Sequence, residues 1–322
     1  MTAQPAESAE PPKPPLIIVG GATATGKTDL AIERAEAIAA DGRPVAVISA
    51  DSRQVFRGLD IGTAKVSAAD RVRVLHFGLD LVEPDEPFSV ADFVAHVGEV
   101  LHRLAVEDGV AILAGGTGLY LRAVGRGIDT AALPSDPQIR ARLEADLLRN
   151  GLPALVARLQ ARAPSLAARV DRRNKRRVVR ALEIAEVAGD VGLPPPRGYP
   201  GLTLWLALAV DPAEHARRIA GRARAQFDAG LIDEARTLRE RFDTNLPAFS
   251  AIGYREAWAV LDGDLSRDAA IELDARRNVA FAKRQRTWFR AEPGITWLDA
   301  TRRDLVESAL RAARALVDRG PR

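Results

Sequence analysis

The sequence predicts an α/β fold, with a P-loop-type parallel sheet covered by helices on both faces and an all-helical insertion domain. Short apolar runs alternate with segments of helical periodicity up to about residue 132 and again from residue 201, which is the pattern of βαβ units. The first run leads directly into G-x-x-x-x-G-K-T, and residues 133–200 contain no strand candidate.

Each element of the first half has its own signal. LIIVG (16–20) predicts the first strand, and residues 26–42 predict a helix because their apolar residues recur at helical spacing up to a glycine. PVAVISADS (44–52), VRVLHFGLDLV (72–82) and GVAILAGGTGLY (109–120) predict three more strands, with a helix over 89–109. These continuous apolar runs are typical of strands that are buried on both faces.

The second half resumes the sheet after the insertion. Prolines punctuate the helical segment, and VGLPPPRGYPG (191–201) closes it. LTLWLALAV (202–210) predicts a strand, two long basic helices follow, and GITWLDA (294–300) predicts a last strand. We therefore expect a disordered proline-rich tail at 1–15, a core of 16–132 and 201–322 with basic C-terminal helices, and a helical insertion at 133–200.

Composition excludes several classes of protein. The 322 residues include no cysteine, so disulfides, thiolate metal sites and thiol nucleophiles are excluded. No apolar run reaches the ~18 residues of a membrane span, and the first residues lack the basic and apolar regions of a signal peptide. We expect a cytoplasmic protein and, with nothing to indicate an oligomer, a monomer. The net charge of +3 identifies no partner.

The glycine-rich loop predicts phosphate binding. Successive backbone N–H groups and the start of the following helix form a nest for an anion. Lys27 adds a positive charge, and the Thr28 hydroxyl is a candidate ligand for Mg²⁺. The predicted diphosphate-binding loop comprises Gly21, Ala22, Thr23, Ala24, Thr25, Gly26, Lys27 and Thr28.

Two absences argue against an ordinary NTPase. The carboxylate that supports Mg²⁺ in an NTPase normally ends a later buried strand, whereas residues 111–118 contain no acid, and there is no N-K-x-D. The acid that can face the loop is Asp51, at the end of the second predicted strand. Because carboxyl ends of neighbouring parallel strands share one crevice, we expect Asp51 close to Lys27 and Thr28.

Two basic runs indicate RNA binding. Between Arg158 and Arg180 there are nine Lys or Arg residues and one acid, and between Arg276 and Arg290 there are six and no acid. The second run also contains Trp288 and two phenylalanines. Basic side chains beside aromatic ones suit a single-stranded RNA loop, whose bases stack while its phosphates require counter-charge.

Six motifs carry a family resemblance. GATATGKT, ISADSRQVFRGLDIGTAK, LAGGTGLYLRAV, RRVVRALEI, AIGYREAW and AKRQRTWFR occur in this order, as in bacterial tRNA dimethylallyltransferases, which the chain resembles from about residue 16 to about residue 298. The chain departs from the family pattern at Ala22, where proline is usual, at Phe56, where tyrosine is usual, and across 171–176.

The resemblance implies a reaction and roles for several residues. The loop would grip the diphosphate of dimethylallyl diphosphate, and the five-carbon group would pass to N6 of the adenosine 3′-adjacent to the anticodon. Asp51 resembles the base that accepts the N6 proton, and Thr117 resembles a threonine near the reacting adenine. Arg218 and Arg222 resemble cationic partners of the diphosphate, with Mg²⁺ on Thr28.

The resemblance also implies an interface with the tRNA anticodon stem-loop. The implied tRNA-binding residues are Asp51, Ser52, Arg53, Gln54, Thr117, Arg140, Arg176, Arg177, Val178, Val179, Arg180, Ser250, Ala251, Ile252, Gly253, Tyr254, Arg255, Lys283, Arg284, Gln285, Arg286, Thr287, Trp288, Phe289 and Arg290. Gln54 is further expected to hydrogen-bond the edge of the base.

Three alternatives stay open. The chain could alkylate a free adenine nucleotide, it could be a small-molecule kinase that binds ATP in the loop and uses Asp51 as a base, or it could bind RNA without catalysis. The histidines at 76, 96, 102 and 215 show no metal-ligand spacing, and we expect surface or packing roles for them. Trp205 is expected in the core.

Overall fold

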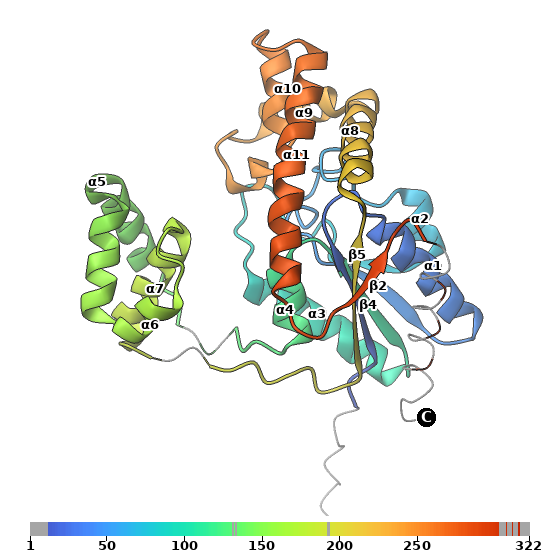
Figure 1. Ribbon diagram of the computed structural model, residues 1–322, viewed down its shortest axis with the longest axis horizontal. Coiled ribbons are helices and arrows are strands. Elements are labelled where there is room, and N and C mark those ends of the chain that lie inside the picture. Colours follow the sequence, from blue (N-terminus) through green and yellow to red (C-terminus); the bar gives the residue numbers. More distant parts are fainter. Residues whose placement is uncertain are drawn as a thin grey trace, which may run out of the picture. The chain divides into compact units, whose positions relative to one another are not determined.

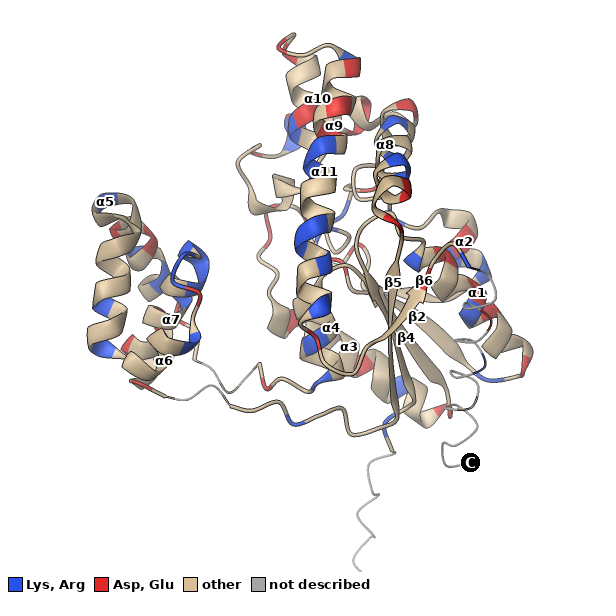
Figure 2. Cartoon of the chain, in the orientation of Figure 1, with Lys and Arg blue, Asp and Glu red and all other residues tan. Residues whose placement is uncertain are grey.

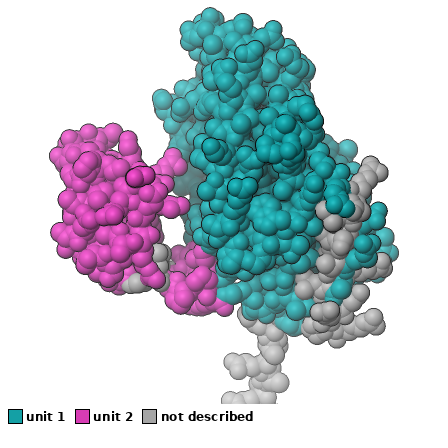
Figure 3. Space-filling view, viewed as in Figure 1, with its two compact units in different colours: residues 1–126, 198–322 teal, residues 127–197 magenta. Residues whose placement is uncertain are grey.

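The computed structural model divides into two compact units (Figures 1 and 3). Unit 1 comprises Met1–Arg126 and Gly198–Arg322, and unit 2 comprises Gly127–Arg197, compared with the predicted insertion of 133–200. The structure describes residues 12–130, 132, 134–191 and 194–302, together with residues 307, 311 and 315. Residues 1–11 of the predicted tail lie outside the described residues.

Unit 1 is built on one parallel six-stranded sheet, which confirms the predicted fold class. Its strands are β1 (Leu16–Gly21), β2 (Val45–Ser49), β3 (His76–Phe77), β4 (Val110–Gly115), β5 (Thr203–Ala209) and β6 (Thr296–Asp299). Their order is β3-β2-β4-β1-β5-β6, and every pair is parallel. β4 therefore lies between β1 and β2. The loops that follow β2, β4 and β1 consequently lie side by side at the carboxyl edge of the sheet.

The third predicted strand is much shorter than expected. Of residues 72–82, only His76–Phe77 pair with β2, and residues 72–73 belong to helix α2 (Ala68–Arg73). The hydroxyl of Ser67 caps that helix by accepting from the Asp70 N–H, which is a strong helix-start signal. The apolar run at 72–82 is therefore shared between a helix end, an edge strand and a loop.

Alternating side chains of the strands build two cores. On one face, Ile17 and Val19 of β1 pack with α1 (Lys27–Ala40). On the other, Leu16 and Ile18 pack with α3 (Val90–Val106) and α4 (Gly118–Gly125). Helices thus cover both faces, as the buried strands require. Trp205 of β5 is buried in the second core, as predicted.

The chain after β5 folds into more helices than the two predicted. α8 (Pro212–Asp228) and α11 (Arg267–Arg290) are the long ones, and α9 (Leu231–Arg241), a 3₁₀ turn (Pro247–Ser250) and α10 (Tyr254–Leu261) lie between them. Buried aromatic rings join this region, with Phe249 edge-on to Trp258 at 5.3 Å between centroids. α11 contacts α8 and α10 and also reaches β1 and α4.

The regular elements among the described residues of unit 2 are all helices. It contains α5 (Pro137–Arg162), α6 (Pro164–Arg169) and α7 (Lys175–Ala188). α5 is interrupted at Gly151, which has a left-handed φ of 73°, two residues before Pro153. Leu143, Leu159 and Leu182 centre a separate apolar core, so unit 2 buries its own hydrophobic surface.

No helix in the described part of the chain has both the length and the apolar character that a membrane span requires.

Candidate active site

The phosphate loop joins β1 to α1. Ala24 and Gly26 adopt left-handed φ values of 58° and 87°, which turn the backbone so that its amides converge. Gly26 is the N-cap of α1 and supplies no side-chain cap, and the first N–H groups of a helix have no partner within it. These donors and the positive end of the helix dipole form an anion site.

The charge of Lys27 is held in a partly buried position. Its ammonium donates to the Ala22 carbonyl at 2.6 Å, and the Thr25 hydroxyl donates to the same oxygen at 2.9 Å. Burial and the nearby charge of Arg222 lower the pKa of Lys27 to about 8, while Asp51 opposes the shift. The charged form therefore gains stability when an anion binds beside it.

Asp51 and Thr117 follow the ends of β2 and β4. The Asp51 Oδ1 accepts from the Arg53 N–H at 2.8 Å, and the Thr117 Oγ1 accepts from the Ser52 N–H at 3.0 Å. The prediction treated β1 and β2 as neighbouring strands. In the structure they are not neighbours, because β4 lies between them. Thr117 thus comes from the strand that separates Asp51 from the phosphate loop.

One cavity of about 420 Å³ contains these groups. Lys27, Thr28, Asp51, Thr117 and Arg222 all line it, as expected for Asp51 relative to Lys27 and Thr28. Its wall continues to residues 62–64, to 250–252 and to the middle of α11. The cavity therefore brings together a phosphate site, a carboxylate and a hydroxyl.

The two predicted cationic partners of the diphosphate lie in different settings. Arg222 lines the cavity and donates through Nη1 to the Thr23 hydroxyl at 2.8 Å. Arg218 is not among the cavity residues, and its Nε donates to the Glu214 carboxylate at 2.9 Å. Arg222 therefore lies beside the phosphate loop at the cavity, whereas for Arg218 the contact with the diphosphate stays a prediction.

Two further side chains hydrogen-bond the backbone of Thr23, a role that was not predicted for them from the sequence. His215, 3% exposed, donates from Nε2 to the Thr23 carbonyl at 2.7 Å, and Gln285, 8% exposed, accepts from the Thr23 N–H at 2.8 Å. Burial lowers the pKa of His215, with Arg286 and Lys27 lowering it further against the hydrogen bond to Thr23. The only available signal for His215 was its position one turn before the R-I-x-x-R motif.

Two other polar residues of the cavity are bonded to the protein. The Gln54 amide donates to the carbonyls of Thr63 and Ala64 and accepts from the Ser49 hydroxyl, so a hydrogen bond to a base edge is not its main contact. His76 binds the Val74 carbonyl through Nδ1, and its buried Nε2 has no partner among the described residues.

Several predicted tRNA contacts are in the cores. The buried ones outside the cavity wall are Val178, Val179, Gly253, Tyr254 and Phe289. The valines are part of the unit 2 core, and the aromatic rings are part of the unit 1 core. In this structure the valine and aromatic side chains of this group are covered by their cores, so tRNA contact at these five positions stays a prediction. The predicted set was taken from whole motifs, which include buried positions.

The exposed basic side chains of α11 fit the predicted interface better. Lys283 and Arg290 are exposed, and Arg284 is stacked over the Phe281 ring at 5.6 Å on the cavity wall. Figure 2 shows blue Lys and Arg segments along α11. Arg122, from α4, stacks over Trp288 at 4.6 Å.

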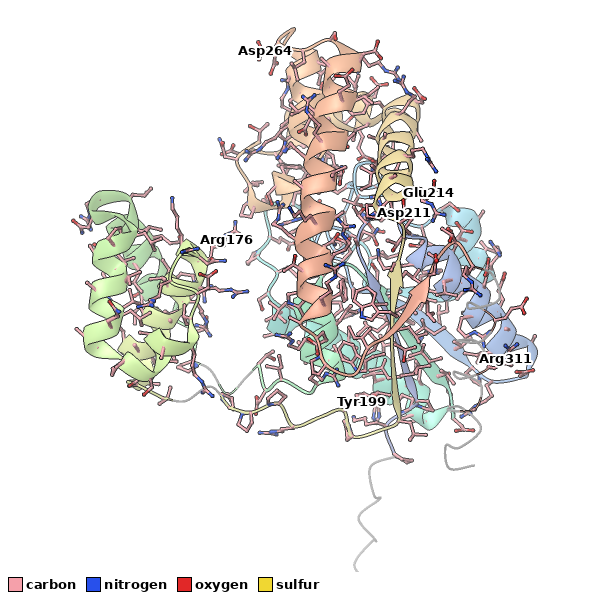
Figure 4. The ribbon with its side chains drawn as sticks, viewed as in Figure 1. Arg176, Tyr199, Asp211, Glu214, Asp264 and Arg311 are labelled. Carbon is pink, nitrogen blue, oxygen red and sulfur yellow. The ribbon has the colours of Figure 1, made fainter. Side chains whose placement is uncertain are left out.

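The arginines of unit 2 that were predicted to contact tRNA differ in their partners. Arg140 binds the fully buried Glu183 through Nε and Nη2, each at 3.0 Å, and Arg180 binds the same carboxylate at 2.9 Å. The exposed cluster comprises Arg172, Arg173, Lys175, Arg176 and Arg177, and within the described ranges no salt bridge involves it. Figure 4 shows Arg176 projecting from the surface of unit 2.

Metal binding by protein groups alone is not indicated. Across the described residues there is no group of three or more His, Asp or Glu side chains placed to hold a metal ion. Among the oxygen donors that line the cavity, the Thr28 hydroxyl lies at the start of α1, beside the anion site. This donor set suits an ion that is bound largely by phosphate oxygens, as Mg²⁺ often is.

The chain is similar to known enzymes over most of its length. A family model described as IPP transferase matches residues 54–292. A tRNA dimethylallyltransferase of Anaeromyxobacter dehalogenans is 43% identical over 291 residues, covering 88% of this chain and 94% of the relative. One from Thiobacillus denitrificans is 41% identical over 304 residues, covering 92% and 95%.

Solved structures agree. The full-length tRNA isopentenylpyrophosphate transferase of Bacillus halodurans matches with a TM-score of 0.69 at 33% identity, covering 95% of this chain and 97% of that one. A eukaryotic dimethylallyltransferase acting on tRNA shares the fold at a TM-score of 0.74 and 22% identity, covering 96% and 80%. The resemblance inferred from the six motifs is confirmed, and the chain belongs to the IPP transferase family, the family of the tRNA dimethylallyltransferases.

Proposed function

We propose that the chain transfers a dimethylallyl group from dimethylallyl diphosphate to N6 of the adenosine 3′-adjacent to the anticodon of tRNA. The observation that carries this proposal is the shared cavity, in which the phosphate loop, Asp51 and Thr117 meet. In the reaction a bond forms between N6 and C1 of the allyl group, the bond from C1 to the diphosphate oxygen breaks, and N6 loses a proton.

The leaving diphosphate requires positive charge. Lys27, Arg222 and the N-terminus of α1 border one part of the cavity. Their charges stabilise the negative charge that develops on the departing oxygen. We include the Thr28 hydroxyl as a ligand of Mg²⁺, which when bound neutralises charge on the diphosphate. Replacing Thr28 by Val should then weaken the dependence of diphosphate affinity on Mg²⁺.

Asp51 is assigned as the base. One carboxylate oxygen accepts from the Arg53 N–H, which fixes the orientation of the group and leaves the other oxygen to accept the N6 proton. The Thr117 oxygen accepts from the Ser52 N–H. Its own O–H can therefore donate to the oxygen that bridges C1 and the diphosphate.

The RNA partner is proposed from the exposed charges. The basic side chains of α11 and the cluster at 172–177 provide counter-charge for phosphates. A base in the anticodon loop must leave its stack before N6 can approach Asp51. We also propose that the protein acts as a monomer, in the cytoplasm where tRNA is modified.

The deciding experiment is nucleoside mass spectrometry. Unmodified tRNA is incubated with the protein, Mg²⁺ and dimethylallyl diphosphate, and the digest is analysed for dimethylallyladenosine. We expect the modified nucleoside with the wild-type chain and a loss of roughly 10²–10⁴-fold in rate with Asp51→Asn. Diphosphate affinity should be retained in that variant.

A matched control is Asp264→Asn, at the exposed loop between α10 and α11 (Figure 4), which should react like the wild type. Modification of free AMP in preference to tRNA would favour the nucleotide alternative. Tight ATP binding without binding of the allyl diphosphate would favour a kinase, and tRNA binding that is equally functional in Asp51→Asn would favour a protein without catalysis.

A further inference from the structure

Gln285 connects two loops of the site from the buried side of α11. Its Oε1 accepts from the Thr23 N–H of the phosphate loop at 2.8 Å. Its Nε2 donates to the Gly116 carbonyl, in the loop that carries Thr117, at 3.0 Å. Only 8% of the residue is exposed. The amide therefore spans the gap between the diphosphate site and the catalytic hydroxyl.

At the phosphate loop, all three polar groups of Thr23 are hydrogen-bonded to side chains. The N–H of Thr23 is bound by Gln285, its carbonyl by His215 and its hydroxyl by Arg222. These three side chains come from α8 and α11, far along the chain from the loop. Since the Thr23 N–H is already bonded, the anion nest begins after it, and the position of the nest depends on this clamp.

The glycines of G-G-T-G show that α11 approaches very closely. A Cβ added to Gly116 would lie 2.3 Å from the Gln285 Nε2, and one added to Gly118 would lie 2.4 Å from the Trp288 ring. Neither glycine has a positive φ, so conformational freedom does not explain them. Gly116 is the residue that lets the amide reach the backbone.

We propose that Gln285 is a positioning residue that sets the separation between the diphosphate loop and Thr117. This inference rests on the proposed function. The resemblance implies instead that Gln285 contacts tRNA, but its amide is bonded at both ends within the protein. An error of about 1 Å in the placement of reacting groups can reduce a rate by roughly 10²-fold, so a residue that fixes this separation affects turnover more than affinity.

The test compares Gln285→Met, which keeps the length and removes both hydrogen bonds, with Lys283→Met on the exposed side of the same helix. Gln285→Met should lower kcat by roughly 10- to 100-fold with an unchanged KM for tRNA. Lys283→Met should raise the KM for tRNA with little change in kcat. If Gln285→Met raises the KM for tRNA and leaves kcat intact, Gln285 is an RNA contact and the proposal is wrong.

A double-mutant cycle with Thr117→Val separates positioning from general damage. If Gln285 acts through Thr117, the kcat losses of the two single variants are non-additive, and the double variant is no slower than the slower single one. Additive losses overturn the proposal. If Gln285→Met melts well below the wild type, the cycle is repeated with Gln285→Glu, which keeps the acceptor for Thr23 and loses the donor to Gly116. A wild-type chain without transfer activity would instead refute the proposed function.

Discussion

Among the residues of the site, Lys27 is the clearest case of a side chain whose surroundings disfavour its charged form. It is partly buried, it lies near Arg222, and its pKa is lowered to about 8. The folded state therefore binds fewer protons than the unfolded state between about pH 8 and 10.5. In that window the free energy of unfolding rises with pH on account of this group. Lys27 is thus a residue that costs stability for the sake of binding an anion.

The affinity for diphosphate should depend on pH with the opposite sign. An anion favours the charged lysine, so binding is strongest below about pH 8 and weakens by up to roughly tenfold per pH unit above it. Calorimetric titration of inorganic diphosphate from about pH 7 to about pH 9.5 measures this. The ligand gains charge in the same range, and Lys27→Met provides the baseline. An identical pH profile in Lys27→Met would contradict the assignment.

For single residues, the sequence was sufficient where the expected role follows from neighbouring residues in the chain. Lys27 and Thr28 follow from the loop chemistry, and Asp51 follows from its place at a strand end. Gln285 and His215 could not be assigned in the same way, because their partners are backbone atoms of Thr23 262 and 192 residues away along the chain. Arg218 pairs with Glu214, one turn earlier on the same helix, and does not line the cavity, so its predicted contact with the diphosphate stays a prediction.

Among the elements, α11 has the greatest influence on the site. One side of it packs against the glycines of β1 and of the loop after β4, and the other is exposed and basic. Because α11 contacts these glycines on one side and carries the basic residues on the other, a displacement of the helix moves both. The fit of its buried side should therefore be sensitive to single methyl groups.

Gly118→Ala should destabilise the protein by about 1–3 kcal/mol, because the new methyl group meets the Trp288 ring at 2.4 Å. Urea denaturation followed by circular dichroism measures the free energy of unfolding. Gly98→Ala is the control, since a Cβ there has nothing within 4 Å in helix α3. That variant should be stabilised by about 0.4–1 kcal/mol. Equal effects of the two substitutions would show that packing against Trp288 does not matter.

The exposed cluster of basic residues at 172–177 spans the turn before helix α7 and its first residues. Arg176→Ala and Arg177→Ala should each weaken tRNA binding and reduce the slope of log affinity against log salt by roughly 0.7 if single-stranded contacts dominate. Arg149→Ala is the control, because Arg149 is 69% exposed in its side chain and pairs with Asp146 on the same helix. Fluorescence anisotropy of a labelled anticodon stem-loop at several salt concentrations measures both quantities. An unchanged slope would remove this cluster from the interface.

Element prediction succeeded where burial dictates the pattern. The predicted runs at 16–20 and 109–120 contain β1 (Leu16–Gly21) and β4 (Val110–Gly115), which are buried because both faces of the sheet are covered, although the second run continues into helix α4. The run at 72–82 misled because an edge strand needs little length, and a capped helix competes for the same residues. The strand order also could not be obtained from periodicity, which carries no information on which strands are neighbours.

The chain divides into two compact units with separate cores. The chain leaves unit 1 at Arg126 and returns at Gly198, and the Gly198 N–H donates to the Arg126 carbonyl at 2.9 Å. The next pair, Arg197 N–H and Gly127 carbonyl, is bonded at 3.0 Å. The start and the end of the insertion therefore lie within one hydrogen bond of each other.

Joining Arg126 to Gly198 through a short Gly-Ser linker should leave unit 1 folded, since its core contains no residue of unit 2. We expect unchanged affinity for inorganic diphosphate and weaker binding of the anticodon stem-loop. Calorimetry and anisotropy measure the two. A shortened chain that cannot bind diphosphate would show that unit 1 depends on unit 2.

That paired entry and exit has an evolutionary corollary. When the two ends of an inserted segment are adjacent, the segment can be replaced as a cassette by that of a homologue without a change in the backbone of the domain that receives it. Chimeras carrying the helical cassette of a distant homologue would then report which features of tRNA choice reside in the cassette and which in the scaffold.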